Sequence, residues 1–396
     1  MTEPEQAQNT KHVRKVYGLD AHPTMFSLAL LSGEDALQAR TEWVVDRQPL
    51  DRLVEFIKKR TEDGAEIALE ASGNSFELAE RIEACGRHPV VLESQSVGKV
   101  GKSYCATDRV DAIKIARVWF SGLAHVVWRP DPRTRELRQM FFAHRNAVED
   151  STRARNRLWA WFNDLGIKQP GQKLLARADA LPKLLALKDL TKCQQMLLAD
   201  MVSDYHRAEV RRKQLRSVMA CELASNPDMR KLVRVLGIRT RVAFALVAFI
   251  GDIRRFATHR KLVAYFGLNP YVSRSGKGGG TGSLAKCGRS DVRTLLIQAA
   301  QAALRYGRAS VHRWALALKM RKGKPIAVAA LARKIVVAVW YLLNGLVAAL
   351  KEPDETLKRK VHKIALEIGA STLKRMNYRT LTLFEEELLQ KIALGT

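Results

Sequence analysis

The sequence is poor in cysteine and has no cysteine pair at metal-binding spacing. Its 396 residues include five cysteines, which are Cys85, Cys105, Cys193, Cys221 and Cys287. Their number is odd and their spacing contains no C-x-x-C pair, so the chain shows neither a disulfide framework nor a cysteine zinc site. We therefore expect a reducing compartment and a cytoplasmic location.

A long uninterrupted apolar segment is also missing. The chain does not open with a charged segment followed by an apolar one, as a secretory signal would. The longest apolar run, residues 335–350, contains Asn344 and falls short of the ~20 residues that a bilayer requires. The sequence thus predicts a buried helix at this run and no membrane partner.

Acidic residues are scarce beside basic ones. The formal net charge is +27, from 67 Lys and Arg against 40 Asp and Glu. Residues 1–125 hold 16 basic and 19 acidic residues, so the whole positive excess lies in residues 126–396. Such a charge predicts a polyanionic partner, and nucleic acid is the usual one. Charge alone indicates this partner but no reaction.

The chain is long enough for two or three domains, and its N-terminal part predicts a mixed α/β fold. Period-two alternation and β-branched residues predict strands at 13–20, 24–32, 39–45, 65–72 and 88–94. Amphipathic spacing predicts helices at 49–60, 75–85 and 107–122. Three strands followed by alternating helices and strands indicate one sheet with helices on its faces.

The rest of the chain predicts helices. Two long amphipathic segments, residues 134–166 and 191–223, have a Pro/Gly break between them and predict an antiparallel hairpin or coiled coil with arginines outward. Residues 230–251 place a glycine turn between apolar helices. This turn fits either a helix-hairpin-helix that binds phosphate through backbone amides or a simple helical hairpin. Residues 290–350 are expected to be helical, and residues 351–396 to contain two helical pieces.

Four carboxylates in the N-terminal part have the spacing of a metal site. Asp20 ends the first predicted strand, Glu70 ends the fourth, and Asp108 and Asp111 are three residues apart on a predicted helix. An i, i+3 pair projects from one helix face, and oxygen ligands suit Mg²⁺ or Mn²⁺. Each residue taken alone is better explained as a cap, a turn residue or a solvated side chain. Taken together, they resemble the site of the RuvC-like branch of the ribonuclease H fold.

A glycine-rich stretch, "YVSRSGKGGGTGSLAKCG" at residues 271–288, interrupts the helical half of the chain. It lacks the G-x-x-x-x-G-K-[ST] pattern of a nucleotide-binding P-loop. Its surroundings show an aromatic-G-L-x-P turn, a serine segment, a glycine run, and then K-x-G before a helix. This pattern resembles the C-terminal domain of the DEDD insertion-sequence transposases that include Piv-type invertases and bridge-RNA-guided recombinases. The blocks "YGLDAH", "ALEASGNS" and "ATDRVDA" resemble the family's N-terminal motifs.

The resemblance implies a site-specific DNA recombinase, or transposase, with a serine nucleophile. The matching serine is Ser275, with Ser273 and Ser283 as secondary candidates. Asp20, Glu70, Asp108 and Asp111 would hold Mg²⁺ or Mn²⁺ beside it. The basic residues expected to contact nucleic acid near the serine are Arg274, Lys277, Lys286 and Arg289.

The family resemblance also implies partners and an assembly. These are donor and target DNA, a structured noncoding guide RNA, and a dimer or tetramer in which serine and carboxylates meet across protomers. The location implied is the bacterial cytoplasm, in association with the nucleoid. Two alternatives remain: a metal-dependent junction-resolving nuclease that uses water, and a non-catalytic nucleic-acid-binding scaffold.

These observations predict an α/β domain of RuvC-like type followed by all-α regions. The predicted division is a disordered start at 1–12, a RuvC-like metal-binding domain at 13–125, a helical hairpin at 126–228, a serine-containing transposase domain at 229–350, and a helical extension at 351–396.

Overall fold

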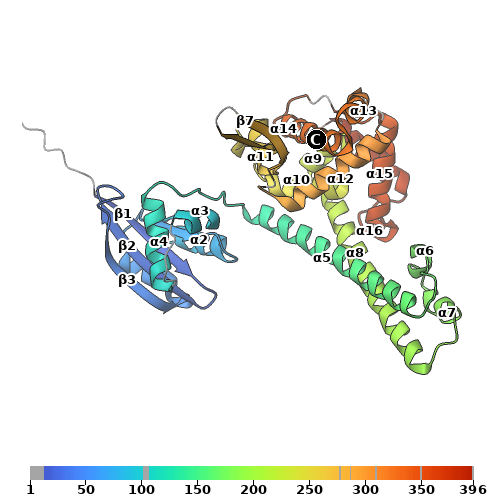
Figure 1. Ribbon diagram of the computed structural model, residues 1–396, viewed down its shortest axis with the longest axis horizontal. Helices are drawn as coiled ribbons and strands as arrows, with labels where there is room; N and C mark the ends of the chain where they lie inside the picture. Colours follow the sequence, from blue (N-terminus) through green and yellow to red (C-terminus); the bar gives the residue numbers. More distant parts are fainter. Residues whose placement is uncertain are drawn as a thin grey trace, which may run out of the picture. The chain divides into compact units, whose positions relative to one another are not determined.

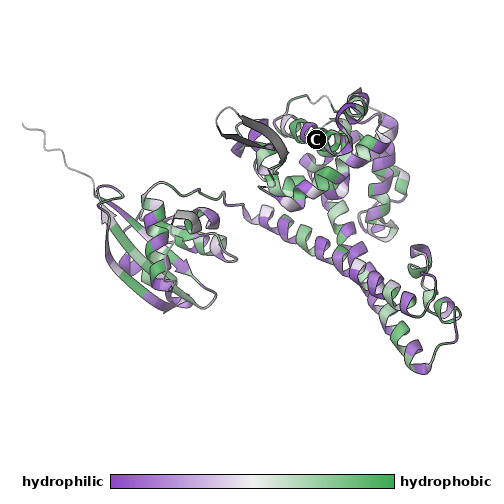
Figure 2. Cartoon of the chain, viewed as in Figure 1, coloured by the Kyte–Doolittle hydropathy of each residue, from purple (hydrophilic) through white to green (hydrophobic). Residues whose placement is uncertain are grey.

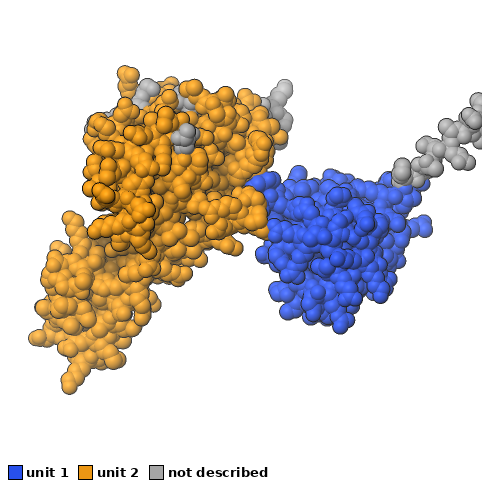
Figure 3. All heavy atoms as spheres, turned by 180° about the vertical axis from the view of Figure 1, so that it is seen from behind, with its two compact units in different colours: residues 1–130 blue, residues 131–396 orange. Residues whose placement is uncertain are grey.

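The computed structural model describes residues 13–100, 107–275, 278–285, 287–307, 310–347 and 350–394. The chain divides into two compact units, residues 1–130 and 131–396 (Figure 3). The predicted metal-binding domain falls in the first unit, and the predicted segments from residue 131 onward fall in the second. Each unit is described by itself.

The first unit contains a five-stranded sheet with the strand order β3-β2-β1-β4-β5 (Figure 1). Its strands are β1 (Arg14–Ala21), β2 (Met25–Gly33), β3 (Arg40–Pro49), β4 (Glu66–Glu70) and β5 (His88–Leu92). β1, β2 and β3 pair antiparallel, whereas β4 and β5 run parallel to β1. The mixed α/β prediction and its five strands are confirmed.

Helices cover both faces of this sheet because its strands bury side chains on both sides. A short 3-10 turn, Leu50–Arg52, leads into α1 (Leu53–Arg60), and α1 packs with α2 (Ser75–Glu83) against the face of Leu19 and Leu28. The other face, with Val16 and Ala68, is covered by α3 (Ser94–Val100) and α4 (Asp108–Phe120).

Gly18 sets how closely α4 approaches the sheet. A Cβ at Gly18 would lie 2.1 Å from the carbonyl oxygen of Ala112 and 2.8 Å from the Cβ of Ala116. Only glycine therefore allows the backbone of α4 to cross β1 at this point. The N-terminal turn of α4 is consequently held close to the end of β1.

The second unit begins with two long helices, α5 (Pro132–Asp164) and α8 (Lys192–Ser225). The buried residues of α5 recur every three or four positions, from Leu137 through Phe141 to Phe162, and this stripe packs on α8. Hydrophilic residues occupy much of the remaining surface of α5 (Figure 2). The two long helices that the sequence predicts are present and pack on each other. The sequence reading missed the short helices α6 (Gln172–Leu175) and α7 (Ala180–Leu185) in the connection.

The remaining residues form one helical core with a two-stranded sheet. The helices are α9 (Pro227–Val233), α10 (Thr240–Ile250), a 3-10 turn (Ile253–Arg255), α11 (His259–Tyr265), α12 (Ser290–Tyr306), α13 (Ser310–Lys322), α14 (Lys324–Leu343), α15 (Asp354–Ile368), α16 (Ala370–Arg375) and α17 (Leu381–Leu394). The strands β6 (Pro270–Ser275) and β7 (Gly278–Leu284) pair antiparallel. Three helices, rather than the predicted two pieces, follow residue 351.

The apolar helix α14 is the one described helix with the length and composition of a membrane span. Its buried side chains, among them Leu331, Ile335 and Val339, belong to the core shared with α9, α11, α12 and α13. The prediction of a buried helix is confirmed for residues 335–343 and is wrong beyond them, because the helix ends at Leu343 and the side chains of Leu346 and Val347 are exposed.

A buried ion pair joins α15 to the turn between α9 and α10. The Lys360 ammonium donates to the carbonyls of Val233 and Val235, both at 2.8 Å, and lies 2.9 Å from Glu352 Oε1. Glu352 also accepts from the backbone amide of Gly237 at 3.0 Å. Burial lowers the pKa of Lys360 to about 8, although Glu352 opposes the shift.

The hydrogen bond between Gly237 and Glu352 favours one of the two interpretations of the turn in residues 230–251. In a phosphate-binding helix-hairpin-helix the turn amides face the ligand, but the Gly237 amide is bonded to Glu352. A Cβ at Gly237 would lie 2.6 Å from the carbonyl oxygen of Ala299, so the turn packs on α12. The geometry favours the simple helical hairpin.

We expect Lys360→Met to lower the free energy of unfolding by about 3–5 kcal/mol, because it leaves a buried, unpaired carboxylate at Glu352. Urea denaturation monitored by circular dichroism would measure the change. Lys358→Met is the matched control, since Lys358 is exposed and its partner Glu355 is at 3.6 Å. If Lys360→Met were as stable as Lys358→Met, the ion pair between Lys360 and Glu352 would not stabilise the extension, which would contradict this prediction.

Candidate metal centre and serine hairpin

Two of the predicted metal ligands are placed by neighbouring parallel strands. Leu19 of β1 is in register with Leu69 of β4, and Asp20 and Glu70 are the next residues on the two strands. Alternation along each strand puts Asp20 on the face of Gly18 and Glu70 on the face of Ala68, and α4 covers this face. Both carboxylates therefore lie at one edge of the sheet, beneath the start of α4.

The other two ligands come from the first turn of α4. Thr107 caps the helix, since its side chain accepts from the amide of Val110. Asp108 precedes the buried Ala112 by four residues, and Asp111 precedes the buried Ile115 by the same spacing. The two aspartates thus continue the sheet-facing stripe of α4 by one turn.

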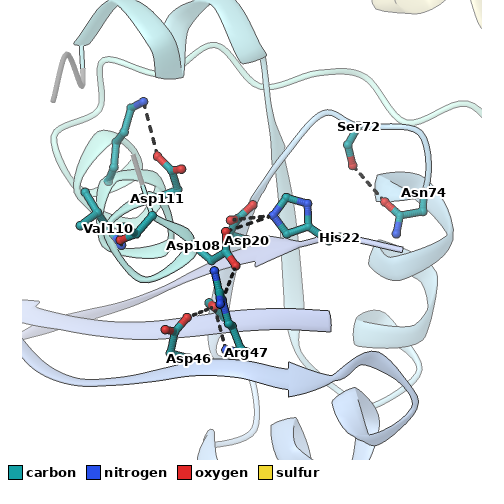
Figure 4. Close-up of polar contacts among 12 residues, drawn as sticks. Asp20, His22, Asp46, Arg47, Ser72, Asn74, Asp108, Val110 and Asp111 are labelled. Carbon is teal, nitrogen blue, oxygen red and sulfur yellow. Dashed lines mark hydrogen bonds and ion pairs between the residues drawn. The ribbon is translucent and has the colours of Figure 1, made fainter. Parts of the chain in front are cut away.

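Figure 4 shows the carboxylates of Asp20 and Asp108 on the same side of the His22 ring, next to one ring nitrogen. His22 Nε2 lies 3.6 Å from Asp20 Oδ2 and 3.5 Å from Asp108 Oδ1. One ligand atom from each of these three residues lies within 4.8 Å of the others. Asp111 Oδ1 lies 3.8 Å from the ammonium nitrogen of Lys114.

The pKa of Asp20 reflects first its burial and then the charges of its neighbours. Burial raises this pKa above its ordinary value, His22 opposes the shift, and Asp111, Asp108 and Glu70 raise it further. The three other carboxylates are therefore close enough to act on Asp20. A set of mutually repelling carboxylates, with His22 beside Asp20 and Asp108, fits a hard divalent cation, which would remove that repulsion. The four predicted ligands suit Mg²⁺ or Mn²⁺ on these grounds.

We expect Asp20→Asn to raise the melting temperature of the cation-free protein at neutral pH. A carboxyl whose folded-state pKa is raised favours folding below its unfolded pKa, and that contribution disappears as pH rises through the folded pKa. The ionised Asp20 thus costs stability at pH 7, and the neutral amide removes the cost. Differential scanning fluorimetry in EDTA checks this, with Asp51→Asn as a surface control. A lower melting temperature for Asp20→Asn, with Asp51→Asn unchanged, would contradict the idea that the ionised Asp20 costs stability.

Two side chains of this site were missed by the sequence reading. His22 lies within the quoted block "YGLDAH", and its position two residues after Asp20 was an available signal. Arg47 Nε lies 3.1 Å from Asp108 Oδ2, although 61 residues separate the two in sequence. Nothing in the local pattern around Arg47 marked it.

The serine stretch forms a β-hairpin rather than an unstructured loop. Ser275 is the last residue of β6, and its backbone pairs with Gly278 of β7. Ser273 pairs with Gly280 in the same ladder. Lys277 and Lys286 lie outside the described residues. Arg274 lies in β6, opposite Gly279.

The two ends of this hairpin are held together by close backbone contacts. A Cβ at Gly267 would lie 2.1 Å from the carbonyl oxygen of Cys287, and one at Gly288 would lie 2.4 Å from that of Tyr265. Both glycines have positive φ, +66° and +100°. The Ala285 amide donates to Asn269 at 2.9 Å. The G-L-x-P and K-x-G motifs are therefore a clamp at the base of the serine hairpin.

Arg289 begins the helix that follows this clamp. Its guanidinium lies 4.3 Å from the ring centroid of Phe249 and donates to Asp291 at 2.9 Å. Its amide donates to the Tyr265 carbonyl at 3.0 Å. Arg289 thus anchors α12 beside the hairpin.

Two transposase families match separate regions of the chain. A family described as "Transposase", of the DEDD type, matches residues 17–165, which include all four carboxylates. A second, described as "Transposase IS116/IS110/IS902 family", matches residues 229–316, which include the serine hairpin. The two matches together cover more than half of the chain. Both matched regions of the chain are thus similar to DEDD transposases. The chain belongs to the IS116/IS110/IS902 family.

Three relatives agree with this assignment. The chain is 27% identical over 235 residues to a putative transposase, y4qE, of Sinorhizobium fredii, covering 58% of this chain and 56% of that protein. It is 25% identical over 294 residues to a probable family 20 transposase of Pseudomonas aeruginosa, covering 70% and 83%. It is 33% identical over 123 residues to the transposase for insertion sequence element IS1111A of Coxiella burnetii, covering 30% and 34%. The match thus spans about half the length of the first relative.

Proposed function

We propose that this protein is a transposase that cuts and rejoins DNA through a serine ester, assisted by a divalent cation on Asp20, Glu70, Asp108 and Asp111. The observation that carries the proposal is the meeting of β1, β4 and the first turn of α4, which brings the four carboxylates to one edge of the sheet. The same chain holds a clamped hairpin that ends one strand on Ser275.

The strand order supports a more specific fold for the first unit. Three antiparallel strands followed by two parallel ones, with helices on both faces, agree with the ribonuclease H fold of RuvC-like type. For the rest of the chain we propose the helical hairpin at 126–228, whose first five residues fall in the first unit, the serine-containing domain at 229–350 and the extension at 351–396. The Lys360 contact to the α9–α10 turn makes the extension part of the same core.

The proposed reaction exchanges one phosphate ester for another. The Ser275 hydroxyl loses its proton to a base, and its oxygen forms a bond to the phosphorus of a DNA phosphodiester. The bond from phosphorus to one deoxyribose oxygen breaks, and that oxygen takes up a proton as a free DNA hydroxyl. Rejoining is the reverse attack by a hydroxyl of another DNA end. The number of phosphoester bonds is conserved, so the exchange needs no ATP.

The acidic set and the basic residues have separate tasks in this scheme. A bound Mg²⁺ or Mn²⁺ would supply charge neutralisation at the phosphate oxygens. Asp20, Glu70, Asp108 and Asp111 would hold and orient that cation through their carboxylate oxygens. Arg274, Lys277, Lys286 and Arg289 are proposed to contact the DNA backbone around the serine.

The proposal also includes an oligomer of the protein and a guide RNA. The serine of one protomer would act with the carboxylates of another, in a dimer or tetramer, on donor and target DNA. A structured noncoding RNA would select those DNAs by base pairing. The positive excess in residues 126–396 supports binding to both nucleic acids, and the protein would act in the nucleoid of a bacterial cytoplasm.

Purified full-length protein, with the RNA that copurifies with it, would be incubated with a supercoiled plasmid carrying the DNA on both sides of its gene. With Mg²⁺ and without ATP, we expect rejoined junctions that sequencing can read. Pretreatment with ribonuclease should abolish them if RNA guides the reaction. Hydrolysed ends without any rejoined junction would instead support the metal-dependent nuclease, and the proposal would be wrong.

A further inference from the structure

Arg47 has an unusual backbone conformation for its residue type. Its φ is +50°, and it is one of two described non-glycine residues with positive φ. A non-glycine residue in this left-handed region is strained and is uncommon away from turns. Such a conformation is maintained only where the surrounding structure holds it.

A buried serine holds this conformation. The register between β2 and β3 shifts between Phe26 and Leu28, which is a β-bulge opposite Ser27. The Ser27 hydroxyl donates to Asp46 Oδ1 at 2.7 Å and accepts from the Arg47 amide at 3.2 Å. Ser27 is 1% exposed, and on its other side it is in register with Asp20. The bulge is thus tied to the strand that carries the first metal ligand.

The bulge redirects the Arg47 side chain toward the carboxylates (Figure 4). Its Nε lies 3.1 Å from Asp108 Oδ2, while His22 faces the other oxygen of Asp108. The side chain remains 67% exposed, and within the described part of the chain its two terminal nitrogens make no hydrogen bond. One edge of the guanidinium therefore contacts a metal ligand and the other edge faces solvent.

We propose that Arg47 is a substrate-positioning residue that binds a non-bridging oxygen of the DNA phosphate presented to the carboxylates. This inference rests on the proposed function. A guanidinium binds phosphate through a planar pair of donors, and Arg47 offers such a pair beside the cation site. A cation bound to Asp108 would neutralise the carboxylate that Arg47 contacts. The DNA phosphate would then replace that carboxylate as the anion paired with the guanidinium.

The test measures DNA binding rather than cutting. Full-length Arg47→Ala, Arg47→Lys and Arg47→Gly would be compared with Arg40→Ala, an exposed arginine at the other end of β3. A fluorescent duplex from the DNA bordering the gene would be titrated in Ca²⁺ across a salt series. We expect about tenfold weaker binding for Arg47→Ala and a salt slope smaller by about one, with no change for Arg40→Ala.

Arg47→Gly distinguishes a role of Arg47 in DNA binding from a role in stability. Arg47→Gly removes the backbone strain, so it should melt no lower than the wild type while binding DNA as weakly as Arg47→Ala. Arg47→Lys should recover the salt slope and only part of the affinity. Wild-type DNA affinity and slope in Arg47→Ala would overturn the inference, as would a tighter cation affinity with unchanged DNA binding. Either result leaves the proposed function standing if the wild type still forms the serine ester.

Discussion

Ser275→Ala is expected to abolish strand cutting, with a loss of at least about 10³-fold, while DNA binding stays at the wild-type level. Alanine lacks the oxygen that forms the ester, and the rest of the hairpin keeps its backbone pairing with Gly278. Cutting of a labelled duplex, resolved on a denaturing gel with Mg²⁺ present, measures the rate. DNA affinity measured on the same preparation shows whether the variant still binds.

The matched controls lie in the same hairpin. Ser273→Ala removes a hydroxyl two residues earlier, and Ser283→Ala removes one on the opposite strand. Both should cut at close to the wild-type rate. If Ser275→Ala retains cutting, water is the nucleophile and the nuclease alternative holds. If Ser273→Ala or Ser283→Ala is the inactive one, the serine assignment is wrong.

The second large effect is expected from the carboxylates. Glu70→Gln and Asp111→Asn should each lower the cutting rate by about 10²–10⁴-fold, since an amide is a far poorer ligand for a hard cation than a carboxylate. Both should also lose the rise in melting temperature that Mg²⁺ or Mn²⁺ gives the wild type, because a ligand stabilises only the state that binds it. Fluorimetry across a metal titration measures the second effect without any DNA.

Glu77→Gln is the control for this set. Glu77 is half exposed on α2 and pairs only locally with Arg81. It should cut and respond to metal like the wild type. Full activity of Asp111→Asn, or a metal response identical to that of Glu77→Gln, would show that Asp111 does not belong to the cation site.

The main helices could be predicted because apolar residues recur in them every three or four positions, and the strands because they are short apolar runs rich in β-branched residues. β1 is buried continuously from Val16 to Leu19 and β4 from Ile67 to Leu69, whereas the stripe on α4 runs from Asp108 through Ala112. These patterns put Asp20, Glu70 and both α4 aspartates on the elements that the structure shows. Their meeting at one sheet edge required the parallel pairing of β1 with β4, which a two-residue period does not specify.

The missed features depend on contacts between distant segments. Arg47 reaches Asp108 only because Ser27 supports a bulge between β2 and β3, and no local signal encodes that register shift. Glycine disfavours strands, so residues 278–284 were not predicted as β7. The clamp between Gly267 and Gly288 explains why this glycine run is ordered as a hairpin. The hydrogen bond from the Gly237 amide to Glu352 was also not predicted, because it joins residues that are 115 positions apart in the sequence.

The most direct measurement is the identity of the atom that carries DNA after cutting. The reaction would be quenched in denaturant, digested with trypsin and nuclease, and analysed by mass spectrometry. The account predicts a nucleotide phosphate on the peptide that contains Ser275, formed with Mg²⁺ and absent with EDTA. A phosphate on any other residue, or cut DNA with no attached peptide, would contradict it.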